Sequence, residues 1–273
     1  MIREKNKSCK RFYLVIFLCL LTFCFSSVAA GTETTKENNV SGEVSVAALS
    51  QYISKGMELS RHSVVIQPSV TVTYKGFGAT IWSNWDSSPY LAGEDRWNEV
   101  EYTLFYGNEY RFLNYEIGYV YDEAFGYSPD THEIYVQLGA NVLLEPAIKI
   151  TKEVGNDRYW YFLFSLGHSF PLIQEKLFFR LSASAGYLHT NDEGSYPKLD
   201  KYGDETGHAF KNFLDGKLKA DLPYNLSENV TITPTLSYTF PLTSEAKHLI
   251  KYMSMTGKEY SFLYGGLIVT YSF

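Results

Sequence analysis

Apolar and polar residues alternate at every second position over most of the chain beyond residue 42. In one run, Leu113, Tyr115, Ile117, Tyr119 and Tyr121 alternate with polar or small residues. A period of two places successive side chains on opposite faces of a β-strand. The apolar parity of the clearest runs contains no charged residue. Each run therefore predicts a strand with one fully apolar face.

Twelve segments of this kind follow one another along the chain: 43–55, 64–74, 77–85, 96–106, 110–121, 131–143, 146–151, 159–170, 176–188, 210–222, 229–240 and 259–273. The connections after the even-numbered segments are short, whereas those after the odd-numbered segments are mostly longer. Short periplasmic turns and long outer loops are typical of outer-membrane barrels. The prediction is an all-β fold, a transmembrane antiparallel up-and-down β-barrel of about twelve strands.

A soluble β-sandwich would also alternate, with its apolar face turned inward. Two further features favour the barrel. The segments often run to ten to fourteen residues, whereas strands in globular proteins average about five or six. Tyrosines also gather at segment ends, including Tyr74, Tyr106, Tyr187 and Tyr271, where a membrane barrel carries its aromatic girdles.

The first 30 residues predict a secretory signal peptide. Five basic residues lie between Arg3 and Arg11, an apolar run from Phe12 to Phe25 follows, and small residues precede a cleavage point near Ala30. That order is the pattern of a cleaved export signal. The expected organisation is a signal peptide over 1–30, a polar periplasmic lead-in over 31–42 and an outer-membrane barrel over 43–273. The expected location is the outer membrane of a Gram-negative cell.

Removal of the signal peptide changes the charge balance and the cysteine count. It removes five of the 24 basic residues and one of the 30 acidic residues, which leaves 19 against 29 and a net charge of −10. An acidic chain is a poor partner for nucleic acid. Cys9, Cys19 and Cys24 are all lost with the signal, so no disulfide is expected. No motif points to a catalytic residue, a cofactor or a metal ion.

The last segment ends in Phe273, and Leu267, Val269 and Tyr271 share its face. A terminal phenylalanine on an amphipathic last strand resembles the signal that outer-membrane barrels present to their assembly machinery. We therefore expect the barrel assembly machinery, through Phe273, and outer-membrane lipid as partners.

If the apolar parity faces lipid, the polar parity lines the lumen. The candidate lumen or constriction residues are an acidic group and a basic group on the two sides of the barrel: Glu99, Glu101, Glu116 and Glu133, and Lys149, Arg180, Lys217 and Lys219. One interpretation is a network of salt bridges that stiffens the wall. The other is a charged constriction that selects small polar solutes. The two interpretations are compatible.

The function favoured by these residues is a narrow porin, a channel for small hydrophilic solutes, and not an enzyme. A twelve-stranded lumen lies between the filled interior of an eight-stranded barrel and the open channel of a sixteen-stranded one. The alternatives are a structural or adhesive barrel that acts through its long surface loops, and a barrel-embedded lipid-modifying enzyme. The enzyme alternative would need a histidine close to a serine, and His168 beside Ser169 is such a pair.

Two local features carry further predictions. Pro68 and Pro234 fall inside predicted strands, where a missing N–H interrupts the ladder, so a bulge is expected at each. In the last long loop, Ala246, Leu249, Ile250 and Met253 recur at helical spacing, which predicts a helical turn or two.

Several stretches resemble the TorF-type family of outer-membrane porins. They are SKGMELS, VVIQPSVTVTYKGFGATIWSNWD, NEVEYTLFYG and YEIGYVYDE, and the likeness extends over most of the chain beyond the signal peptide. The resemblance implies a barrel and a pore. It carries no catalytic residue over to this sequence.

Overall fold

The computed structural model describes residues 40–89, 95–124 and 129–273. The predicted signal peptide and most of the predicted lead-in lie outside these residues. No helix within them is long and apolar enough to cross a membrane.

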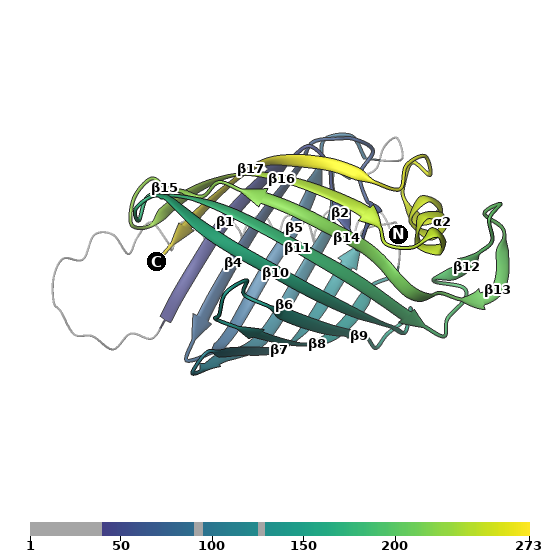
Figure 1. Cartoon of the computed structure of the whole chain (residues 1–273), viewed down its shortest axis with the longest axis horizontal. Helices are drawn as coiled ribbons and strands as arrows, with labels where there is room; N and C mark the ends of the chain where they lie inside the picture. The colour runs from purple at the N-terminus through teal and green to yellow at the C-terminus, as the bar shows by residue number, and fades with distance from the viewer. Residues whose placement is uncertain (1–39, 90–94, 125–128) are drawn as a thin grey trace, which may run out of the picture. The chain divides into compact units, whose positions relative to one another are not determined.

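The described residues form a closed, antiparallel barrel of twelve strands (Figure 1). The strands are β1 (Val40–Leu49), β4 (Val65–Tyr74), β5 (Phe77–Asp86), β6 (Trp97–Tyr110), β7 (Leu113–Ala124), β8 (Thr131–Ala140), β9 (Ala147–Glu153), β10 (Tyr159–Ile173), β11 (Leu177–Thr190), β14 (Lys211–Asp221), β16 (Val230–Pro241) and β17 (Phe262–Ser272). Consecutive barrel strands pair with one another, and β1 pairs with β17 to close the ring. The predicted fold class is confirmed.

The apolar parity faces outward, as the sequence predicted. Leu104, Ile117 and Leu138 are 62%, 51% and 52% exposed, and each alternates with a residue on the lumen side. Soluble proteins seldom expose a continuous apolar surface of this extent. Such a band is what a lipid-facing barrel wall requires.

The two ends of the barrel differ in their connections. At the terminal end, where Gly42 donates a backbone hydrogen bond to Phe273 (2.8 Å), the connections are short. The turn between β4 and β5 is Lys75-Gly76, with φ of 49° and 86°; positive φ at both central residues suits a two-residue hairpin turn. The opposite, loop end carries the longer connections, which hold α2 (Ser244–Met253) and the short hairpins β2–β3 (Ile53–Ser54 and Met57–Glu58) and β12–β13 (Pro197–Leu199 and Glu205–Ala209). A last short strand, β15 (Tyr224–Asn225), borders β11 and β16 at the terminal end.

Helix α2 confirms the predicted helical segment in the last long loop. Thr243 caps its N-terminus by accepting a hydrogen bond from the backbone N–H of Ala246 (3.1 Å), which satisfies one of the free donors of the first turn. Ala246, Leu249 and Ile250 are fully buried, so the apolar face predicted from the spacing is the face that packs on the barrel.

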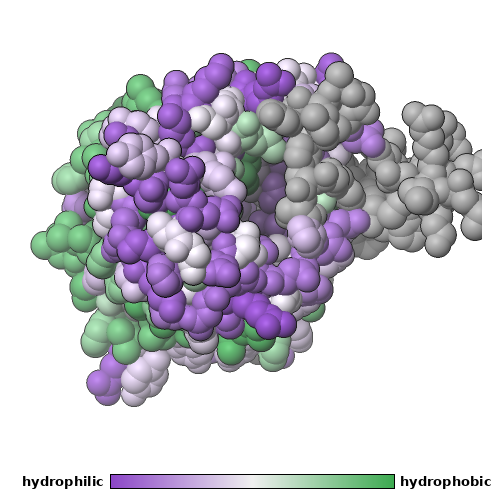
Figure 2. All heavy atoms as spheres, turned by 90° about the vertical axis from the view of Figure 1, so that its right-hand side faces the viewer, coloured by the Kyte–Doolittle hydropathy of each residue, from purple (hydrophilic) through white to green (hydrophobic). Residues whose placement is uncertain are grey.

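An apolar cluster occupies one side of the loop end. It joins residues from the β2–β3 hairpin, β10, β11, α2, β17 and the segment around β14: Ile53, Met57, Tyr159, Tyr161, Leu188, Tyr196, Phe210, Leu214, Ala246, Leu249, Ile250, Phe262 and Tyr264. Figure 2 looks onto this end and shows a mainly hydrophilic surface, with hydrophobic residues on the flank of the barrel. The inner faces of β4–β9 lie beyond this cluster.

Two predictions about the strands are wrong. The first segment was expected to run to Lys55, but β1 ends at Leu49. The chain then turns inward, because residues 53–58 form a hairpin of their own. The expected bulges at Pro68 and Pro234 are also absent. Strand pairing between β4 and β5 has a gap at Pro68 and resumes in the same register, and Pro234 pairs with Leu267 without a shift. A proline removes one donor but adds no residue, so the register survives.

The orientation of the faces predicts different outcomes for two arginine substitutions. Leu181 is 46% exposed on the lipid face of β11, and Leu181→Arg should cost about 2–4 kcal/mol of folding free energy in a bilayer. Thr235→Arg is the matched control, since Thr235 lies on the lumen side of β16 opposite Asp221. Urea unfolding of both variants in lipid vesicles measures the difference. Equal losses of stability would contradict the assignment of faces.

Candidate functional site

The lumen contains a cavity of about 690 Å³ between the barrel wall and the inward-turned chain after β1. Its polar and charged lining comes mostly from the inner faces of β4–β9 and from the hairpin β2–β3: Tyr52, Ser54, Lys55, Thr71, Thr80, Asn98, Glu99, Glu101, Thr103, Glu116, Asp122, Thr131, Glu133, Tyr135, Lys149, Asp157, Tyr159 and Tyr196. Met57, Leu59, Met253 and Met255 are among its apolar residues. The cavity is therefore a polar compartment with a small apolar side.

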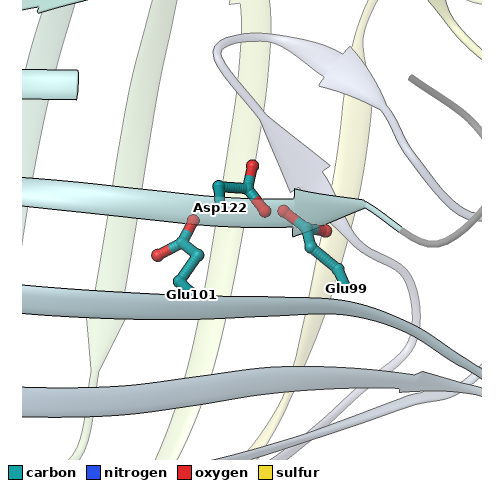
Figure 3. A group of neighbouring side chains, drawn as sticks. All are labelled: Glu99, Glu101 and Asp122. Carbon is teal, nitrogen blue, oxygen red and sulfur yellow. The ribbon is translucent and has the colours of Figure 1, made fainter. Parts of the chain in front are cut away.

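Three carboxylates form the most acidic part of the lining (Figure 3). Glu99 and Glu101 rise from β6 and Asp122 from β7, and ligand oxygens of the three lie within 4.8 Å of one another. Glu101 and Asp122 are direct cross-strand partners, so the pleat places them on the same face. Carboxylate oxygens are the ligands that hard cations such as Mg²⁺ and Ca²⁺ take in proteins. This group is the densest cluster of carboxylates that the structure describes in the cavity.

Neighbouring side chains hold this acidic wall in place. The hydroxyl of Tyr52 donates to Glu99 (3.2 Å), and the ring of Tyr52 packs against Trp82, with 5.7 Å between centroids. Farther along the wall, the hydroxyl of Tyr135 donates to Glu116 (2.7 Å). The ring of Tyr135 lies over Gly118, where a Cβ would be only 2.5 Å from it. Glycine is therefore required for the ring to lie flat against the wall.

The two amines of the lining make different contacts with neighbouring side chains. Nζ of Lys149 lies 3.9 Å from the ring centroid of Tyr135, a cation–π contact. Nζ of Lys55 forms a salt bridge with Glu133 (2.8 Å) and a hydrogen bond with the hydroxyl of Tyr159, which itself donates to Glu133. Lys55 thus closes a three-residue network across the lumen, from the hairpin to β8 and β10.

Carboxylates outnumber amines in this cavity. Glu99, Glu101, Glu116, Asp122, Glu133 and Asp157 face Lys55 and Lys149. Among the residues that the structure describes, the salt bridge between members of this lining is Lys55–Glu133. A cleft lined mainly by one sign of charge and walled by protein concentrates ions of the opposite sign. This lining carries more acidic than basic side chains.

The structure gathers only part of the sequence-predicted set. Glu99, Glu101, Glu116, Glu133 and Lys149 all line the cavity. The remaining basic residues lie elsewhere. Arg180 pairs with Glu145 (2.5 Å) in the turn between β8 and β9 at the terminal end, and Lys219 pairs with Asp221 (3.0 Å). Lys217 lies on the same inner parity of β14 as Lys219, between Ser184 and Thr239. None of these three belongs to the cavity lining.

Sequence reasoning missed Lys55 and Asp122 as site residues. Asp122 was lost because the predicted strand stopped at Tyr121, whereas β7 continues to Ala124. Lys55 was placed at the end of a barrel strand, although Lys55-Gly56 repeats the dipeptide of the Lys75-Gly76 turn. Both pairs have positive φ at each residue, 46° and 79° at Lys55 and Gly56. A second Lys-Gly pair shortly after a strand was the signal for the hairpin.

Comparisons with known proteins show which fold this cavity belongs to. No protein-family model matches the chain, and no curated protein matches it either. Among solved structures, the chain is similar to the KdgM porin, with 12% identity and a TM-score of 0.51 over 85% of this chain and 99% of the porin. It is also similar to the NanC porin, with 13% identity and a TM-score of 0.50 over 84% and 98% of the two chains. The protein therefore has the closed transmembrane barrel fold of these outer-membrane porins.

The anchoring of the hairpin predicts a local effect of substituting Glu58. This buried carboxylate accepts hydrogen bonds from Oγ1 (2.6 Å) and N (3.3 Å) of Thr256. Glu58→Ala should leave those donors without their partner and destabilise the hairpin by about 1–3 kcal/mol. Hydrogen exchange should show faster exchange in residues 52–59 and unchanged protection in the barrel strands.

Glu109→Ala serves as the control, because Glu109 is exposed at the terminal end of β6. If the two variants give the same exchange in residues 52–59, Glu58 does not anchor the hairpin.

Proposed function

We propose that this protein is a narrow outer-membrane channel for small hydrophilic solutes that prefers cations. The observation that carries the proposal is the cavity of about 690 Å³ inside a closed barrel, with six carboxylates and two amines in its lining. Rings of acidic side chains are the usual basis of cation selectivity in pores. The proposal retains the charged constriction that was predicted from the sequence. Its basic residues are now Lys55 and Lys149.

The same proposal gives the protein a location and an orientation. The apolar outer band suits the bilayer, and the export signal predicted over residues 1–30 would deliver the chain to the envelope. The end of the barrel where β1 begins and where Phe273 lies carries the short turns. In this orientation that end faces the periplasm, as it does in outer-membrane barrels. Phe273 remains the proposed contact with the assembly machinery, and the TorF-type porin family remains the proposed family.

The solute class proposed for this protein differs from the ligand described for one similar barrel. The KdgM porin is described in complex with disordered oligogalacturonate, whose name denotes a carboxylate-bearing sugar chain. The acidic lining formed by Glu99, Glu101, Glu116 and Asp122 would repel such a ligand. We therefore do not assign that solute to this protein.

The enzyme alternative gains no support from the residue that suggested it. The ring of His168 packs edge-on against Phe170, with 4.6 Å between centroids. Among the described residues, no hydrogen bond joins His168 to a serine. The adhesive alternative is separated from the channel by conductance, because a barrel that acts through its loops needs no open path.

Conductance in planar bilayers tests the proposal. Purified protein should give discrete current steps, and the reversal potential in a salt gradient should show a cation preference that weakens at high salt, as screening requires. Replacement of the acidic group, by Glu99→Gln, Glu101→Gln and Asp122→Asn together, should reduce the ratio of cation to anion permeability about tenfold or more, since each nearby unit charge supplies a severalfold factor.

Glu123→Gln is the matched control for this triple variant. Glu123 follows Asp122 directly but alternates onto the outer face of β7 with Tyr121, which stacks on Tyr102 there. The control should keep the wild-type selectivity. Folded protein that stays silent at every voltage would contradict the channel, and a selectivity unaffected by the triple variant would contradict the role of the acidic wall.

Fractionation tests the location separately. The protein should be recovered with outer membranes, and its folded form should migrate faster on gels than the boiled form, because a closed barrel resists detergent. Recovery in the soluble periplasmic fraction would contradict the proposed location.

A further inference from the structure

We propose that the β2–β3 hairpin is a fixed constriction of the lumen, and that Lys55 at its tip is the residue that limits the channel's preference for cations. This inference rests on the proposed channel function. It concerns a segment that belongs to no barrel strand and that crosses the interior where the cavity lies.

The hairpin extends from the paired ends of β1 and β4 across the lumen to strands on the far side of the ring. At its tip, Lys55 reaches Glu133 on β8 (2.8 Å) and Tyr159 on β10. Next to Lys55 in the same turn, Gly56 lies so close to β14 and α2 that a Cβ would be 2.7 Å from Cβ of Asp215 and 3.1 Å from Cδ1 of Ile250. The hairpin therefore occupies the lumen between the β1–β4 wall and these strands, and the cavity lies beside it.

Buried contacts hold the base of the hairpin. The backbone N–H of Glu58 donates to Oγ of Ser254 (3.0 Å), and its carbonyl accepts from the N–H of Met255 (2.9 Å). Next to it, Met57 is 6% exposed within the apolar cluster. At the other strand, the N–H of Tyr52 donates to Oγ of Ser60 (2.8 Å). Pairing at both strands and a tight two-residue turn make the hairpin a rigid part of the lumen.

The position of Lys55 gives it control over charge selectivity. Its amine is one of two positive groups in a lining that holds six carboxylates, and it neutralises Glu133 directly. Loss of this amine leaves Glu133 unpaired and makes the passage more negative. One unit charge about 4–5 Å from a passing ion in water changes the occupancy of that ion about four- to sixfold.

The chain offers a clean way to remove the whole hairpin. Leu49 and Val65 are cross-strand partners at the ends of β1 and β4. A two-residue Asn-Gly turn can therefore replace residues 50–64 and join the strands directly, since that dipeptide favours the required backbone conformation. Lys55→Gln is the second variant, because it keeps the hairpin and removes only the charge. Lys211→Gln is its matched control, since Lys211 is exposed at the loop end, where it donates to Asn191 (2.7 Å).

Single-channel recording of these four proteins decides the inference. We expect Lys55→Gln to raise the ratio of cation to anion permeability at least about fourfold, and the shortened chain to raise the conductance about twofold or more. Lys211→Gln should match the wild type. If the shortened chain does not fold, the Lys55→Gln comparison alone decides.

The outcomes separate the two proposals. A conducting wild type whose Lys55→Gln variant keeps the same selectivity overturns the inference and leaves the channel in place. A silent wild type with a conducting shortened chain supports the hairpin as a constriction and contradicts the open channel. If the wild type and all folded variants show no conductance, both the channel function and the inference about the hairpin are overturned.

Discussion

The pairing of β1 with β17 is the interaction on which the rest of this structure depends. A bilayer core offers no water to satisfy backbone N–H and C=O groups, so a sheet can cross it only if it has no free edge. The register between Glu43 and Ser272 at one end and Leu49 and Gly266 at the other joins the first barrel strand to the last. Gly266 makes this possible, because a Cβ there would lie 1.9 Å from the carbonyl oxygen of Ala48.

Closure also determines where the charged residues go. Once the ring is formed, one parity of every strand meets lipid and the other meets the lumen, so Glu101 and Asp122 are brought together on one wall. A lumen of twelve strands is wider than the filled interior of an eight-stranded barrel and narrower than the channel of a sixteen-stranded one. The long loop-end connections use part of this space, and the apolar cluster around Leu249 and Ile250 fills one side. The remaining cavity is acidic because β6, β7 and β8 place most of its carboxylates on its wall.

Packing inside the barrel then sets the chemistry of that cavity. Tyr135 bridges an acid and an amine, since its hydroxyl binds Glu116 and its ring lies under Lys149. Lys55 reaches the opposite wall only because the chain after β1 folds inward. Glu116 is hydrogen-bonded, Lys55 is ion-paired and Lys149 lies over an aromatic ring. Such contacts offset the cost of burying a charged side chain. The interior is therefore polar and ordered at the same time.

The sequence by itself determined the fold and most of one wall of the lumen. The period of two is a local property, so alternation placed twelve strands close to their observed positions and put Glu99, Glu101, Glu116 and Glu133 on the inner face. It also located α2, because helical spacing is equally local. Only the tertiary structure decided which charges meet. All barrel strands show the same alternation, so the sequence does not indicate which strands the loops will cover. Arg180 and Lys217 were therefore expected opposite the acidic wall. Lys55 takes that place because packing of the loop end against α2 and β14 carries its hairpin there, and that depends on contacts between segments far apart in the chain.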